Sequence, residues 1–190
     1  MAFSRFILTL AIVVLVMADV LLAKVQVNTD INLYNNYIGE TAEEEYKHKL
    51  GVDESIFPKE ISEGMEVEDY KMVYYNPWDA QYLSYLVINY DDEVYMQEWA
   101  RLDEIGCNDY IGIYGVTGFT KYQLIAMNAN EYHGFVYALT DGDGKIIYVE
   151  LLFCNYFYDI SYNDYINSDY LPDGFDATID NAYRKEKLDG

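Results

Sequence analysis

The feature that most limits the fold of this chain is a series of four runs of strand length in its second half. The runs are Tyr110–Thr117, Lys121–Met127, Tyr132–Thr140 and Lys145–Phe157. Only three or four residues separate each run from the next. Connectors this short join antiparallel neighbours, because a parallel crossover requires about a dozen residues or more. The sequence therefore predicts an antiparallel meander.

A helix with one apolar stripe is predicted just before these runs. Its first turn holds Asp91, Asp92 and Glu93, whose negative charges complement the positive end of the helix dipole. Gly106 is expected to end the helix. Four apolar residues recur every three or four positions and form one face that must pack against another surface. These residues are Tyr95, Trp99, Leu102 and Ile105.

Two further runs of strand character precede the helix, over residues 65–75 and 82–90. The second of these is apolar on both faces, which is typical of a strand that is covered on both sides. The chain is therefore expected to fold as an α+β domain. Its antiparallel meander sheet would have about four to six strands, with the amphipathic helix packed on one face.

The chain divides into four segments on this reading. Residues 65–158 form the α+β core domain, and residues 159–190 form an acidic C-terminal segment rich in Tyr, Asp and Asn. Residues 24–64 are expected to be a linker with a short surface helix that is capped at Thr41. The order of one helix and four strands over Tyr82–Phe157 resembles that of cystatin-like and related folds. Such folds host inhibitors, binders and enzymes, so the resemblance implies no function.

The N-terminal segment, residues 1–23, is predicted to direct the chain across a membrane as a hydrophobic helix. Phe6–Met17 carries no charge, and apolar character continues beyond Asp19 to Ala23. A membrane span needs roughly 20 apolar residues, whereas a signal peptide needs a core of roughly 7 to 15. The segment is therefore either an uncleaved anchor over residues 6–23 or a signal peptide that is cut near Ala18. In both cases the domain is extracytoplasmic, membrane-anchored or secreted.

Charge and composition limit the partners of the domain. The chain has 33 acidic and 12 basic residues, a net charge of −21, and such a surface repels nucleic acid and anionic lipid. It has no Gly-rich phosphate loop, so no nucleotide is expected. The 22 tyrosines either occupy half-buried strand positions or form a stacking surface for sugars or peptides. A protein, peptide or glycan partner is therefore expected.

Glu150 is the most unusual carboxylate, because it interrupts an apolar strand. Alternation places it on one face with Tyr148, Leu152 and Cys154. This mixed face is a candidate binding surface, with Tyr148, Glu150 and Leu152 as ligand contacts. If Glu150 is buried, its carboxyl group suits general-acid chemistry, whereas a solvent-facing residue would carry no such role.

Two further groups of side chains are candidates for metal binding and cross-linking. In the C-terminal segment, Asp159, Asp164, Asp169 and Asp173 recur among Asn and Tyr, so they are calcium candidates or part of a solvated acidic surface. Cys107 and Cys154 either form a disulfide or remain two buried thiols. Residues 141–144 fit a tight hairpin turn better than a calcium loop, because Lys and Ile follow where the calcium loop needs a ligand and Gly.

The sequence favours a non-catalytic, extracytoplasmic binding or interaction domain over an enzyme. It has no dense group of titratable residues, and no nucleophile or zinc motif is present. The alternative is a glycosidase-like hydrolase that uses Glu150 with a second carboxylate. No cofactor is expected apart from calcium at the aspartates named above.

Overall fold

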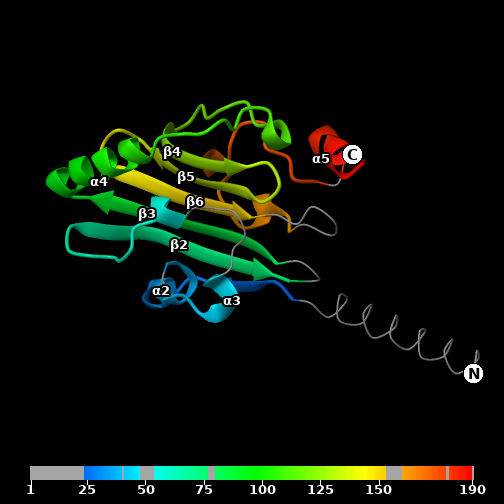
Figure 1. Ribbon diagram of the computed structural model, residues 1–190. Coiled ribbons are helices and arrows are strands. Elements are labelled where there is room, and N and C mark those ends of the chain that lie inside the picture. The colour runs from blue at the N-terminus through cyan, green and yellow to red at the C-terminus, as the bar shows by residue number, and fades with distance from the viewer. Residues whose placement is uncertain are drawn as a thin grey trace, which may run out of the picture.

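Six antiparallel strands form one open sheet in the order β1-β2-β3-β6-β5-β4 (Figure 1). The computed structural model describes residues 24–39, 41–47, 54–76, 80–152, 160–178 and 180–189. The strands are β1 (Gln26–Asn28), β2 (Met65–Tyr75), β3 (Gln81–Tyr90), β4 (Gln123–Asn130), β5 (Gly134–Thr140) and β6 (Lys145–Leu152). The predicted α+β class and the antiparallel sheet are confirmed.

Strands β3 and β6 lie at the centre of the sheet. The whole of β6 pairs with β3, from Leu152 opposite Tyr82 to Lys145 opposite Asn89. This pairing joins the β2–β3 hairpin to the β4–β5–β6 meander. Every residue of β3 except Asn89 is buried. The strand that the sequence predicts to be apolar on both faces is therefore covered on both sides.

The predicted strand over Tyr110–Thr117 is wrong. The segment contains the short 3-10 helix η3 (Ile113–Gly115) and turns back on itself. Gly112, Tyr114 and Gly115 have φ values of 88°, 49° and 83°, a left-handed backbone that a strand does not contain. Gly115 is also packed so closely that an added Cβ would lie 2.7 Å from the carbonyl oxygen of Gly174. The segment therefore covers the sheet and does not extend it.

The outer edge of β4 is partly closed by the chain that follows the main helix. The backbone N–H of Asn108 donates to the carbonyl of Met127 at 3.2 Å, and that of Met127 donates to the carbonyl of Gly106 at 2.9 Å. The Asn108 side chain then makes two bonds of 2.7 Å with the backbone of Ala129. These bonds occupy edge groups that would otherwise be free to pair with another chain.

Helix α4 (Asp92–Ile105) lies where it was predicted, with Asp91 as its N-cap residue and Gly106 at its C-terminus. Leu102 is fully buried against the sheet, and Tyr95 and Trp99 pack partly on the same apolar cluster. Ile105, the last member of the predicted stripe, is 38% exposed. The stripe thus buries its central part and leaves its end at the surface.

The described residues between β1 and β2 complete the layer on this face of the sheet. They include η1 (Ile31–Leu33), α2 (Tyr34–Tyr37), α3 (Glu44–Lys47) and η2 (Glu54–Ile56). Figure 1 shows α2 and α3 beside β2. The buried side chains from this segment are Tyr34, Ile38, Ala42, Tyr46, Ile56 and Phe57. The Thr41 hydroxyl donates to the carbonyl of Asn35 at 3.2 Å, and α3 begins at Glu44.

The C-terminal segment covers the opposite face. It contains η4 (Tyr162–Asp164), η5 (Ser168–Tyr170) and α5 (Ala182–Asp189). Its buried side chains are Ile160, Tyr162, Ile166, Leu171 and Ala177. Asp173 pairs through its backbone with Gly118, and the Tyr137 hydroxyl donates to the carbonyl of Tyr170 at 2.8 Å. The sheet is thus the middle layer of three.

None of the helices in the described residues has the length and apolar character needed to cross a bilayer. The predicted N-terminal hydrophobic helix, residues 1–23, lies outside the described residues.

Gly134 is expected to be indispensable at the start of β5. Its φ is 139°, and an added Cβ would overlap the carbonyl oxygen of Leu151. Gly118 has the same φ but open space around it, so Gly118→Ala is a matched control for backbone strain alone. We expect Gly134→Ala to lower the free energy of unfolding by roughly 2 kcal/mol or more beyond the loss in Gly118→Ala. Urea unfolding of both variants measures the difference, and equal losses would contradict the steric explanation.

Candidate functional site

Glu150 lies in the middle of β6 on the face that alternation predicts. It pairs with Ser84 of β3 on one side and with Val136 of β5 on the other. Tyr148 and Leu152 belong to the apolar cluster of this face, and Glu150 lies between them. Glu150 and Tyr148 are 0% exposed and Leu152 is 5% exposed. The three predicted ligand contacts therefore lie together beneath the helical layer, and Glu150 does not face solvent.

Two buried hydroxyl groups lie on the same face as Glu150. Ser84 Oγ and the Tyr70 hydroxyl are both inaccessible to solvent and have no hydrogen-bond partner in the part of the chain that the structure describes. Burial raises the pKa of Tyr70 well above its ordinary value, and Tyr37, Glu150 and Asp30 raise it further. The interior of this face thus combines an acid with two hydroxyl groups.

Glu98 on α4 is the other buried carboxylate among the described residues. Arg101 binds it through two hydrogen bonds, from Nε to Oε2 and from Nη2 to Oε1, both 2.7 Å long. The Tyr148 hydroxyl donates to Glu98 Oε1 at 2.6 Å, and the Tyr90 and Tyr148 hydroxyls lie 2.5 Å apart. The carboxylate is therefore fully engaged by charge-assisted bonds.

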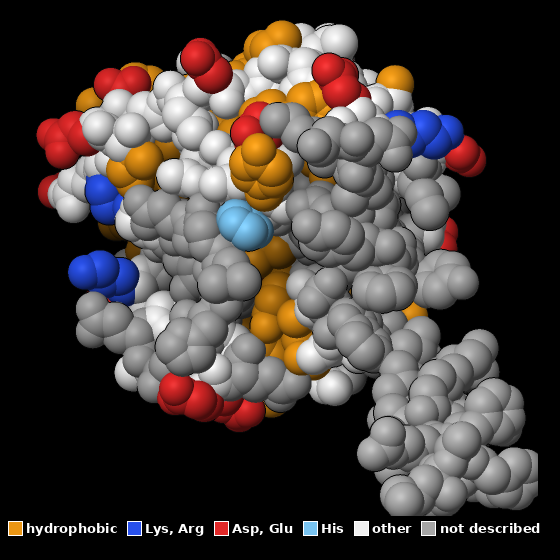
Figure 2. All heavy atoms as spheres, turned by 45° about the vertical axis from the view of Figure 1, so that its right-hand side comes forward, with side chains coloured by type: hydrophobic (Ala, Val, Ile, Leu, Met, Phe, Trp, Pro, Cys, Tyr) orange, Lys and Arg blue, Asp and Glu red, His pale blue; other side chains and the backbone are white. Residues whose placement is uncertain are grey.

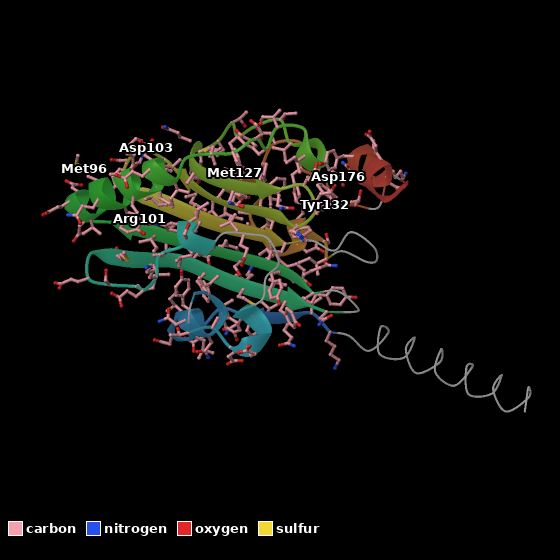
Figure 3. All side chains as sticks on the ribbon, viewed as in Figure 1. Met96, Arg101, Asp103, Met127, Tyr132 and Asp176 are labelled. Carbon is pink, nitrogen blue, oxygen red and sulfur yellow. The ribbon has the colours of Figure 1, made fainter. Side chains whose placement is uncertain are left out.

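Arg101 extends this network from α4 to the N-terminal segment. Its Nη1 donates to the carbonyl of Ser55 at 2.6 Å, and its Nη2 donates to that of Ile56 at 2.8 Å. In Figure 3 Arg101 lies on the side of α4 nearest η2, whereas Met96 lies on its outer side. The network ties α4, β3, β6 and η2 together. A glycosidase-like mechanism with Glu150 and Glu98 would have to use the Glu98 carboxylate, which already binds Arg101 and Tyr148.

The calcium candidates do not form a ligand cluster in the described residues. Asp164 and Asp169 are exposed, and Asp173 Oδ1 accepts a bond of 3.3 Å from the Thr120 hydroxyl. Within the described ranges no three His, Cys, Asp or Glu side chains are placed to hold a metal ion together. On the face shown in Figure 2 the acidic side chains lie in small groups around the rim. Asp159 lies outside the described residues.

Cys107 follows the end of α4 by two residues and is exposed. Its Sγ lies 3.7 Å from the carbonyl oxygen of Ile125, and partial burial of the side chain is the main cause that raises the pKa of the thiol. Cys154 lies outside the described residues, so the disulfide stays a prediction. The predicted turn at residues 141–144 is present, with positive φ at Gly142 and Gly144.

An open groove of about 310 Å³ lies beside α4, and the sequence did not indicate it. We call it the α4 groove. It is lined by Tyr95, Met96, Trp99, Gln123, Thr140 and Gly142. Met96 is 71% exposed, an unusual position for a large apolar side chain. A sequence signal that could have pointed to the groove is Met96, an apolar residue outside the predicted stripe and three positions before Trp99.

Hydrogen bonds fix the floor of the α4 groove. The Tyr95 and Thr140 hydroxyls lie 2.8 Å apart, and Thr140 also donates to the carbonyl of Lys145 at 2.7 Å. The backbone N–H of Gly142 donates to Thr140 Oγ1 at 3.0 Å. The exposed Gln123 leaves a side-chain amide at the rim. The groove therefore offers two aromatic side chains, one of them held by a hydrogen bond, an amide and no basic side chain among its described lining residues.

Comparison with protein-family models, with curated proteins and with solved structures finds no match for this chain.

Arg101→Met tests the network around Glu98. The change leaves Glu98 buried without its cation, and we expect a loss of roughly 3 kcal/mol in the free energy of unfolding. Lys185→Met is the control, because the 3.1 Å ion pair of Lys185 with Asp180 has side chains that are 55% and 88% exposed. That change should shift stability by about 0.5 kcal/mol or less. Similar losses in the two variants by urea unfolding would contradict a structural role for the network.

Proposed function

We propose that this chain is a non-catalytic, extracytoplasmic binding domain, and that its α4 groove binds a neutral glycan. The observation that carries the proposal is the groove itself, with Tyr95 and Trp99 beside an amide and a polar turn. Sugar rings bury their apolar faces on aromatic rings, while their hydroxyl groups bond to amides and carboxylates. The groove provides both kinds of contact within one small surface.

Charge supports a neutral ligand over an anionic one. The described lining of the α4 groove has no Lys, Arg or His, and the turn beside it carries Asp141 and Asp143. The net charge of −21 adds a general repulsion of anions. An aromatic groove bordered by carboxylates therefore suits a sugar that has hydroxyl groups and no phosphate or sulfate.

Export of the domain is part of the proposal. The apolar segment at residues 6–23 supports either an anchor or a signal peptide cut near Ala18, and both would present the α4 groove outside the cytoplasm. Cell fractionation with N-terminal sequencing of the product distinguishes the two forms. Recovery of the intact chain from the cytosol, free of membranes, would contradict export.

Trp99 variants test glycan binding. A panel of soluble neutral oligosaccharides is titrated into the domain, and amide chemical shifts locate the bound member. We expect shifts at α4 and at residues 141–144, with Trp99→Leu weakening binding roughly fivefold to tenfold through loss of stacking, and Trp99→Phe retaining most of it.

The control for this experiment is Tyr132→Leu. Tyr132 is 51% exposed and lies at the end of the molecule away from Met96 (Figure 3). Its replacement should leave binding unchanged. Equal affinity of the wild type and Trp99→Leu, or shifts that gather elsewhere, would contradict the assignment of the groove.

A carboxylate hydrolase is the second candidate, because Glu150 is completely buried beside Ser84. Glu150→Gln removes the acid and nearly preserves its volume. Assayed with a panel of aryl glycosides, the wild type is expected to show no turnover, and Glu150→Gln should bind glycan at the α4 groove as the wild type does. Turnover by the wild type that disappears in Glu150→Gln would overturn the non-catalytic proposal.

A further inference from the structure

The turn between β2 and β3 and the turn between β4 and β5 lie at the same end of the sheet. β6 relates the two, because its last residue, Leu152, pairs with Tyr82 near the start of β3 and with Gly134 at the start of β5. The β4–β5 turn carries Tyr132, which is 51% exposed. We call this end of the sheet the Tyr132 end. Figure 3 shows Tyr132 at the right of the molecule and Met96 at the left.

The chain enters the sheet at the Tyr132 end. In β1, Gln26 pairs with Tyr74, one residue before the end of β2. Two residues separate Gln26 from the apolar segment 6–23. Three steps of extended chain reach roughly 10 Å. A membrane anchor over residues 6–23 would therefore hold the Tyr132 end within that distance of the lipid.

Exposed acids lie at the opposite end of the sheet, at the start of α4 and in the β5–β6 turn. They are Asp91, Asp92, Glu93, Asp141 and Asp143. At the Tyr132 end, the described residues 24–27, 75–76, 80–82 and 130–134 contain one carboxylate, Glu131, which accepts a 3.2 Å bond from the Tyr183 hydroxyl. The connectors 77–79 and 153–159 lie outside the described residues, and their sequences hold one Asp each. Figure 2, which is turned toward this end, shows the acidic side chains at the rim.

We propose that the Tyr132 end lies against the lipid headgroups of the membrane that anchors the chain. The inference depends on the anchored form of the proposed extracytoplasmic domain. Tyr132 suits this boundary, since a tyrosine ring packs among the lipids while its hydroxyl stays in water. Val27 is 50% exposed beside it on β1, and the exposed ammonium group of Lys24 can bind lipid phosphate. The acids at the other end keep their hydration, and anionic lipid would repel them if they approached.

This orientation directs the α4 groove away from the membrane. Thr140 and Gly142 of the groove lie at and beyond the end of β5, whereas Gly134 begins that strand at the Tyr132 end. The six steps from Gly134 to Thr140 span about 20 Å. The groove would therefore receive glycans from the medium or from a facing surface, and the short headgroups of its own bilayer would lie out of reach.

Paramagnetic broadening from the headgroups tests the orientation. The full chain, with residues 1–23 intact, is reconstituted in phosphatidylcholine nanodiscs in which a few lipids carry a paramagnetic headgroup. We expect amide broadening at Tyr132 and Val27 to exceed that at Gly142 at least about tenfold, because the two ends of the sheet lie roughly 20 Å apart.

Two results would overturn the proposal in different ways. Equal or weak broadening at both ends, in a chain that stays with the discs, would refute the orientation and leave the anchor in place. A full chain that does not stay with the discs would refute the anchor on which the orientation depends. Neither result bears on glycan binding at the α4 groove, which the Trp99 variants test separately.

A pair of matched variants tests the contact itself. Tyr132→Glu and Met96→Glu each replace an exposed apolar side chain with a carboxylate, at opposite ends of the molecule. Tyr132→Glu should lower the ratio of broadening between the two ends about threefold, because a carboxylate loses hydration among the headgroups. Met96→Glu should leave the ratio unchanged. An unchanged ratio in a folded Tyr132→Glu would contradict the contact of Tyr132 with lipid.

Discussion

The pairing of β3 with β6 is the interaction on which the rest of this structure depends. The partners are far apart in the chain, and Tyr82 lies opposite Leu152. Without this pairing β1–β2–β3 and β4–β5–β6 would be two three-stranded sheets, each with a buried apolar strand left at an open edge. Once it forms, the residues before β2 and those after β6 each find one face of a continuous apolar sheet to cover. The order of layers therefore follows from one non-local contact.

Tyrosine suits this three-layer arrangement because it fills the core and also reaches polar groups in the covering segments. The hydroxyl of Tyr34 donates to the carbonyl of Pro58 at 2.6 Å, and that of Tyr162 donates to the carbonyl of Leu152 at 3.1 Å. Tyr85 donates to Asp69 Oδ2 at 2.9 Å. Burial raises the pKa of Tyr137 well above its ordinary value, so its hydroxyl keeps the proton that it donates. Tyr162, Tyr137 and Tyr148 thus connect the sheet to its covering layers, whereas Tyr34 and Tyr85 bond within one layer.

Local patterns predicted the elements whose causes are local. The carboxylates at the start of α4, the Gly residues of the turn at 141–144 and the alternation in β6 each act within a few residues, and each was predicted correctly. The run at Tyr110–Thr117 was mistaken for a strand because its left-handed turns depend on packing against Gly174. The α4 groove could not be predicted either, since it combines Trp99, Gln123 and Gly142 from three elements that only the sheet topology brings together.

The distribution of the basic residues explains why the surface charge is so little compensated. Arg101 is occupied by Glu98 and two carbonyl groups, Lys71 donates to the carbonyl of Tyr165 at 2.8 Å, and Lys145 lies 2.6 Å from Glu68. Lys71 thus joins the sheet to the C-terminal segment, Arg101 joins α4 to η2, and Lys145 joins two strands of the sheet. At physiological salt the field of exposed acids falls off within about 8 Å, so it guides ligands only close to the surface. Discrimination between ligands must therefore come from the groups that line a site itself, such as the aromatic rings and the amide of the α4 groove.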